Sequence, residues 1–122
     1  MCKILLSINP EHVTNIINKK KIYEFRKIKC KKNIDKIVIY ATAPISKVIG
    51  EVEVLDIIED LPENVWSITG DFSGISKDFF EKYYRNKDKA IAYKLGDVKE
   101  FKRPKLLQDF GVNFAPQSFV YI

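Results

Sequence analysis

The chain has 122 residues, of which 46% are hydrophobic and 30% charged, and its formal net charge is +5. These values are typical of a soluble globular protein, and we expect residues 1–122 to form a single domain. No apolar run approaches the roughly 20 residues of a transmembrane helix, and the first residues lack the apolar segment of a signal peptide. We therefore expect a cytoplasmic protein that contacts no membrane. We expect it to be a monomer.

Metal and cofactor chemistry has no recognisable motif in this sequence. The two cysteines, Cys2 and Cys30, lack the spacing of metal ligands, and His12 is the only histidine. The glycine-rich loops that cradle phosphates or dinucleotides are also missing. We therefore expect no metal site and no cofactor. His12 falls in the first turn of an expected helix and is predicted to face solvent, so it is not counted among the site residues.

Positive charge is concentrated near the start of the chain. Residues 1–36 contain ten Lys or Arg and three Asp or Glu, an excess of +7, whereas the remaining residues contain eleven and thirteen, a balance of −2. A clustered basic surface is typical of proteins that bind nucleic acid. A lysine-rich composition that serves only as solvated surface would give the same pattern. Phosphate contacts are expected from Lys19, Lys20, Lys29, Lys31 and Lys32.

The order of predicted elements favours a mixed α and β protein. The residues Asn-Pro-Glu at 9–11 are typical of a helix start, and the apolar spacing that follows predicts a helix to about Lys20. Two further helical segments are expected from Pro62 and Ser76, and a short helical turn from Pro104. Strands are expected at 3–8, 22–28, 36–42, 48–55, 88–95, 98–101 and 117–122.

Two glycines interrupt the strand patterns. Gly50 lies inside an alternating run and predicts a bulge or bend of the kind that closes a barrel. Gly96 and Asp97 are predicted to form a turn. Strands that mostly follow one another, with one early helix and one inserted helical segment, predict an α+β fold with a small barrel of about six strands and two to three short helices.

The stretch at residues 19–26 has an unusual pattern of faces. On a strand, Tyr23 and Phe25 share one face, whereas Glu24 and Arg26 share the other with Ile22 and Ile28. Two charged residues between two isoleucines fit neither a solvent face nor an apolar core. Such local contradictions occur at functional sites. A surface ion pair at a sheet edge, worth roughly 0–1 kcal/mol, is the alternative interpretation.

The side chains that remain available for chemistry fit a nucleotide pocket. Lys21 and Arg26 can bind phosphate, while the carboxylate of Glu24 can accept a hydrogen bond from the exocyclic amine of a base. Aromatic side chains can stack on an unstacked base. We expect Lys21, Glu24 and Arg26 to converge on one concave pocket. Further ligand contacts are predicted for Thr42, Trp66, Tyr93 and Ser118.

Four segments make the sequence resemble the ASCH domain family of the PUA-like superfamily. Ser-Ile-Asn-Pro at 7–10 leads into the first helix, and Lys21-x-x-Glu24-x-Arg26 resembles the family's G-x-K-x-x-E-x-R motif. The segments at 43–51 and 116–119 resemble small archaeal and bacterial members. Lys19 stands where the motif has glycine. The resemblance implies a PUA-like mixed β-barrel whose cleft is lined by Lys21, Glu24 and Arg26. It also implies binding of RNA or a modified nucleotide, in connection with transcription or translation control.

One branch of this family hydrolyses acetylated cytidine, and this chain departs from its pattern. The branch has a threonine at the position of Glu24 and a glutamate just before the second helix. Here that region contains Asp71 and Ser73. We therefore favour a binding module for RNA or a nucleoside. The alternatives are a small hydrolase, either an amidohydrolase or a ribonuclease that uses Lys21 as its base with Glu24, and a module that binds an acidic protein partner.

Overall fold

The structure is a computed structural model that describes residues 3–30 and 33–122. Within this part of the chain, strands alternate with short helices, and two strands are much longer than the others. The strands are β1 (Lys3–Ile8), β2 (Tyr23–Arg26), β3 (Lys36–Ala41), β4 (Lys47–Asp60), β5 (Ala90–Lys105) and β6 (Phe119–Tyr121). The helices are α1 (Pro10–Ile17), α2 (Pro62–Thr69), η1 (Gly70–Phe72), α3 (Lys77–Tyr83) and η2 (Leu107–Phe110).

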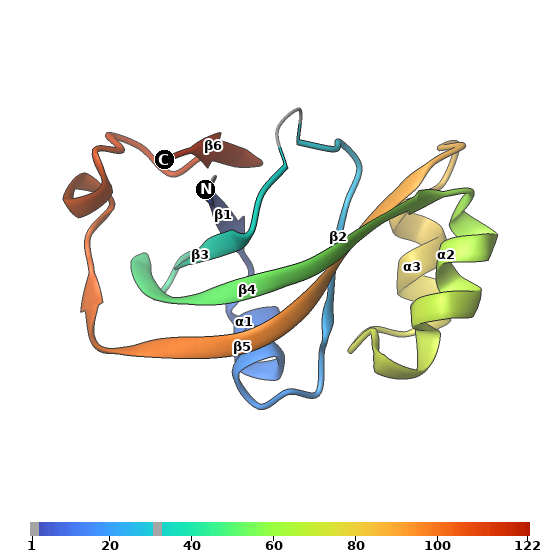
Figure 1. The fold of residues 1–122 in the computed structure, drawn as a ribbon, viewed down its shortest axis with the longest axis horizontal. Helices are drawn as coiled ribbons and strands as arrows, with labels where there is room; N and C mark the ends of the chain where they lie inside the picture. Colours follow the sequence, from blue (N-terminus) through green and yellow to red (C-terminus); the bar gives the residue numbers. More distant parts are fainter. Residues whose placement is uncertain (1–2, 31–32) are drawn as a thin grey trace.

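The six strands form one curled sheet in the order β2-β5-β4-β3-β1-β6. β1 and β3 are parallel, and every other neighbouring pair is antiparallel. Figure 1 shows α2 and α3 packed at one end of the long β4–β5 ribbon, with η2 at the opposite end. The predicted α+β fold with a mixed sheet of six strands is confirmed. β2 and β6 form its two edges, so the sheet is an open half-barrel.

The two strand glycines mark irregularities in the ribbon. The register between β4 and β5 shifts between Val48 and Gly50, as predicted, and a Cβ on Gly50 would lie 2.6 Å from the carbonyl oxygen of Lys99. The turn predicted at Gly96 is wrong, because β5 continues through it. The register shifts again near that point, and a Cβ on Gly96 would lie 2.9 Å from a methyl group of Leu55. The Gly-Asp pair therefore bends the ribbon instead of reversing it.

Helix α1 ends three residues earlier than the apolar spacing predicts. Asn9 caps its first turn by accepting a hydrogen bond from the Glu11 backbone N–H, as expected. At the other end, Lys19 has a φ of 60°, and the backbone N–H groups of Lys20 and Lys21 both donate to the Asn15 carbonyl. This left-handed residue ends the helix and directs the chain into β2.

The apolar side chains form three clusters along the sheet. The largest lies beneath α1 and contains Ile4, Ile37 and Ile39, all fully buried. A second cluster packs α2 and α3 against β2 and β5, and a third lies near η2. The helical turn predicted from Pro104 begins later, at Leu107, because Pro104 belongs to β5. None of the helices within the described residues is long and apolar enough to cross a membrane.

Candidate functional site

Strand β2 places its charged and aromatic residues on opposite sides, as the alternating pattern predicts. Tyr23 and Phe25 belong to the cluster beneath α2 and α3. Glu24 and Arg26 line a cavity between α1, β2 and α3, which the Phe25 side chain also borders. Ile28, which the pattern places on their face, is 64% exposed and lies beyond the end of the strand. The charged residues therefore lie on an edge strand but line a cavity, where they are largely buried and do not form an exposed surface ion pair.

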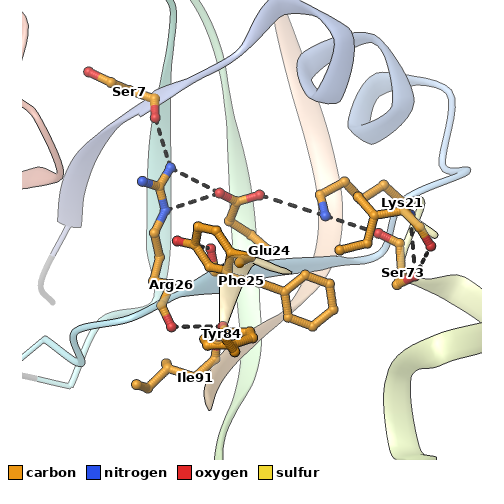
Figure 2. Close-up of polar contacts among 10 residues, drawn as sticks. Ser7, Lys21, Glu24, Phe25, Arg26, Ser73, Tyr84 and Ile91 are labelled. Atoms are coloured by element: carbon orange, nitrogen blue, oxygen red, sulfur yellow. Dashed lines mark hydrogen bonds and ion pairs between the residues drawn. The ribbon is translucent and has the colours of Figure 1, made fainter. Parts of the chain in front are cut away.

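The carboxylate of Glu24 lies between two cations, as Figure 2 shows. Its Oε2 atom is 2.9 Å from Nη2 of Arg26 and accepts a hydrogen bond from Nε of the same residue at 3.1 Å. Its Oε1 atom is 3.9 Å from Nζ of Lys21. The guanidinium also donates to the Ser7 carbonyl at 2.7 Å. These contacts connect β1 with β2 through one buried charge network.

Lys21 is buried and is held from several directions. Its side chain is 2% exposed, and its Nζ donates to the Ser73 carbonyl at 2.9 Å and lies 4.7 Å from the ring centre of Phe25. Gly74, which has a φ of 74°, lies against the lysine stem. Removing one partner from a buried charge network costs about 3–5 kcal/mol, because the remaining charge is left uncompensated. This loop therefore positions the ammonium at the cavity floor.

The charge network opens into a cavity of about 180 Å³. A larger cavity of about 500 Å³ lies between α2 and α3, but the charged triad does not line it. We therefore place the candidate site at the smaller cavity, where cations, a carboxylate and an imidazole converge. The polar or ionisable residues that line it are Ser7, Asn9, His12, Lys21, Glu24, Arg26 and Tyr83, and the apolar ones are Ile8, Phe25, Ile75 and Phe79.

Burial lowers the pKa of Lys21 below its usual value near 10.5. The carboxylate of Glu24 opposes this shift, and the Arg26 guanidinium adds to it. Desolvation therefore has a larger effect on the pKa of Lys21 than the ion pair with Glu24 at 3.9 Å.

His12 faces this cavity and not open solvent, so the prediction for it is wrong. Its ring contacts Phe79 edge to face, with ring centres 5.8 Å apart. Within the described residues, its buried Nδ1 atom has no hydrogen-bond partner. Burial lowers its pKa, and the nearby Lys21 charge lowers the pKa further. At neutral pH the imidazole is therefore uncharged, with one nitrogen available as a proton acceptor.

The other four predicted ligand residues do not line the cavity. Thr42 and Ser118 only contact the backbone of residues that line it. The Thr42 N–H donates to the Ile8 carbonyl, and the Ser118 carbonyl accepts from the Ser7 N–H. Trp66 lines the larger cavity and packs against Phe80. Tyr93 is buried in the core, where its hydroxyl lies 3.0 Å from Sγ of Cys30. Trp66 and Tyr93 are predicted as ligand residues because aromatic rings can stack on bases. Their packing places them at the larger cavity and in the core instead.

The predicted phosphate-binding lysines lie outside the cavity. Lys19 and Lys20 are exposed after α1. Lys29 forms an ion pair with Glu59 at 3.7 Å. Lys31 and Lys32 fall outside the described residues.

Sequence reasoning missed Phe79 and Tyr83 as cavity residues. Their spacing of four on α3 is visible in the sequence, but the same spacing also fits the buried stripe of a helix.

The chain matches, over residues 3–115, the family described as "Domain of unknown function (DUF365)". It is 30% identical over 122 residues to an "ASCH domain-containing ribonuclease" of Zymomonas mobilis, a match that covers 97% of this chain and 82% of that protein. The crystal structure of ASCH from Zymomonas mobilis superimposes with a TM-score of 0.89 at 28% identity, covering 98% of this chain and 87% of the other. This chain belongs to the ASCH domain family. The predicted membership of the ASCH domain family is thereby confirmed.

This ASCH domain also matches segments of much longer proteins. It is 29% identical over 121 residues to ATP synthase subunit alpha of Ureaplasma parvum, where it covers 98% of this chain but spans only 15% of that protein. It spans 28% of the large ribosomal subunit protein uL22 of the same organism, again at 29% identity, with 71% of this chain covered.

Proposed function

We propose that this ASCH domain binds RNA, or a modified nucleotide derived from it, at the cavity above Lys21, Glu24 and Arg26. The carrying observation is the Glu24 carboxylate held between two cations at the cavity floor. With His12 neutral, the floor has one excess positive charge, which favours a phosphate, while the carboxylate can accept a hydrogen bond from a base amine. The ribonuclease name of a relative at 30% identity supports RNA as the ligand class. Control of transcription or translation is the setting that we propose for such binding.

A second candidate function, cleavage of RNA, is favoured by one specific feature. His12 lines the same cavity, and burial lowers its pKa, so its imidazole is uncharged at neutral pH. A neutral imidazole at this position can accept the proton of an attacking hydroxyl group. Arg26 and Lys21 can stabilise the negative charge that develops on the phosphate. The relative named as a ribonuclease supports this candidate as well.

One panel tests both candidates. Nucleosides and short single-stranded RNAs are titrated for binding by fluorescence anisotropy, and the same mixtures are examined for cleavage products. Lys21→Met removes the buried ammonium with little change in volume, and Lys77→Met is the matched control. Lys77 is the first residue of α3, the helix that borders the cavity, but its side chain is exposed and does not line the cavity. Circular dichroism establishes that each variant is folded.

The outcomes separate the two candidates. Binding that is lost in folded Lys21→Met and kept in Lys77→Met supports the RNA-binding site. Equal binding by both variants, or no binding by the wild-type protein, contradicts it. Cleavage that is lost in His12→Gln while binding persists supports the ribonuclease. Binding without any cleavage excludes the ribonuclease and leaves the binding module.

A further inference from the structure

Helix α3 divides its aromatic residues between the core and the cavity. Phe80 and Tyr84 point inward and are 2% and 3% exposed. Phe79 and Tyr83, one residue earlier in each case, line the cavity above the charge network. Positions four apart on a helix lie on the same face. The cavity therefore has an aromatic wall, Phe79 and Tyr83, opposite residues of α1.

The two rings of this wall are nearly parallel. Their planes differ by 10°, and their centres are 6.4 Å apart. The Phe79 ring is 49% exposed although it contacts His12 at its edge. Single exposed phenylalanines are ordinary on protein surfaces. Phe79 differs because an open aromatic surface lies beside a cavity with a polar, charged floor.

Positive charge lies next to the same wall. Nζ of Lys27 lies over the Tyr83 ring, 4.6 Å from its centre. Lys21 and Arg26 lie at the cavity floor. A flat apolar surface flanked by cations matches the two parts of a nucleotide, because a base has a π face and its backbone has a negative phosphate.

We propose that Phe79 is a stacking platform for one unpaired nucleobase, with Tyr83 extending the platform and Lys27 near the attached backbone. This proposal rests on the RNA binding proposed above and narrows its ligand to single-stranded or splayed-out bases. In a duplex, both faces of each base are already stacked on neighbours and its pairing edge is occupied. Only an unpaired base can place a face against Phe79 and its polar edge toward Glu24.

The test compares two exposed phenylalanines in one binding assay. Phe79→Ala removes the platform. Phe72→Ala is the matched control, because Phe72 is 58% exposed and does not line the cavity. Both variants are titrated with a short single-stranded RNA, with the same RNA carrying one abasic position, and with its duplex. Base–aromatic stacking is worth about 1–3 kcal/mol, so Phe79→Ala is expected to weaken single-strand binding about 5- to 150-fold.

A fluorescent variant tests the same contact without a loss of side-chain volume. Phe79→Trp, made in a Trp66→Phe background, is expected to keep binding and to show quenched indole fluorescence when RNA is added. The proposal also predicts that the abasic position weakens wild-type binding and has no further effect in Phe79→Ala. Wild-type binding with equal affinities for Phe79→Ala and Phe72→Ala would overturn the platform and leave RNA binding intact. Absence of wild-type binding to any of the three RNAs would overturn both proposals.

Discussion

Gly74 lies so close to Lys21 that a side chain at position 74 has no space. A Cβ on Gly74 would lie 2.6 Å from Cβ of Lys21 and 2.9 Å from its Cγ. The backbone φ of 74° adds a second reason for glycine, because other residues rarely adopt that conformation. The loop after η1 thus fixes the lysine stem through both its backbone shape and its lack of a side chain.

Gly74→Ala is therefore expected to destabilise the fold and to displace Lys21. Gly111 is a matched control, since its φ is also 74° and a Cβ added there would meet nothing within 4 Å. Gly111→Ala should lower the free energy of unfolding by about 1–2 kcal/mol, the cost of placing a side chain on a left-handed backbone. Gly74→Ala should cost more, as measured by urea denaturation, and should weaken RNA binding. Equal destabilisation of the two variants would contradict the close contact with Lys21.

Lys19→Gly is expected to stabilise the protein. Lys19 ends α1 with a φ of 60°, a conformation that costs non-glycine residues roughly 1 kcal/mol. The free energy of unfolding should rise by up to about that amount. Asn18→Gly serves as the control, because Asn18 has a φ of −80° and gains no relief. A Lys19→Gly variant no more stable than wild type would mean that lysine contributes a compensating contact.

The stability of the protein should depend on the ionisation of His12. Its pKa in the folded state is below the usual value near 6.5, so the unfolded chain binds this proton more readily. The contribution of His12 to the free energy of unfolding therefore increases as pH rises from the folded-state pKa to 6.5, and is lost on acidification through that window. Comparing wild type with His12→Gln from about pH 4.5 to 8 isolates this term. Parallel stability curves for the two proteins would contradict the lowered pKa.

RNA binding should weaken with salt, partly through the lysines after α1. Each phosphate neutralised on a single strand contributes about −0.7 to the slope of log affinity against log salt. Replacing Lys19 and Lys20 by glutamine should flatten the slope by about 1.4. The control replaces Lys102 and Arg103 by glutamine. These are two exposed cations near the end of β5. An unchanged slope in the Lys19 and Lys20 variant would identify these lysines as solvated surface only.

We expect no efficient hydrolysis of N4-acetylcytidine. The lowered pKa of Lys21 favours a base, but the reaction also needs an acid for the leaving amine. Asp71 is exposed and does not line the cavity, and Ser73 offers Lys21 a carbonyl oxygen. The specificity constant at neutral pH should lie below about 10⁴ M⁻¹s⁻¹. Turnover above that value, abolished by Lys21→Met and retained by Lys77→Met, would establish the amidohydrolase.

The sequence predicts those features that local chemistry determines. Asn9 caps α1, Gly50 marks a shift of strand register, and the alternation along β2 places Phe25 in the second apolar cluster and Glu24 in the charge network. It does not determine which of two adjacent aromatics faces the core. Phe79 and Phe80 differ by one helix position, and only the packing of α3 on the sheet assigns one to the cavity.

The remaining differences arise from long-range contacts. His12 faces the cavity because α1 packs across the sheet with Val13 and Ile16 buried, a placement that local periodicity leaves open. Lys21 is close to Ser73, which is 52 positions away in the chain. No motif links these two segments, so the burial that lowers the pKa of Lys21 emerges only from the folded structure.

The pairing of β1 with β6 brings the two ends of the described chain together. Ile4 is opposite Tyr121, and the Ile122 N–H donates to the Lys3 carbonyl at 3.1 Å, so both ends lie on one side of the molecule (Figure 1). A unit with adjacent ends can be spliced into a surface loop of another protein without stretching that loop. The same feature makes the fold a candidate for circular permutation, with new ends at an exposed turn such as residues 43–46. Insertion of residues 3–122 into a surface loop of a host protein would carry the whole cavity with it, because all of its lining residues belong to this one unit.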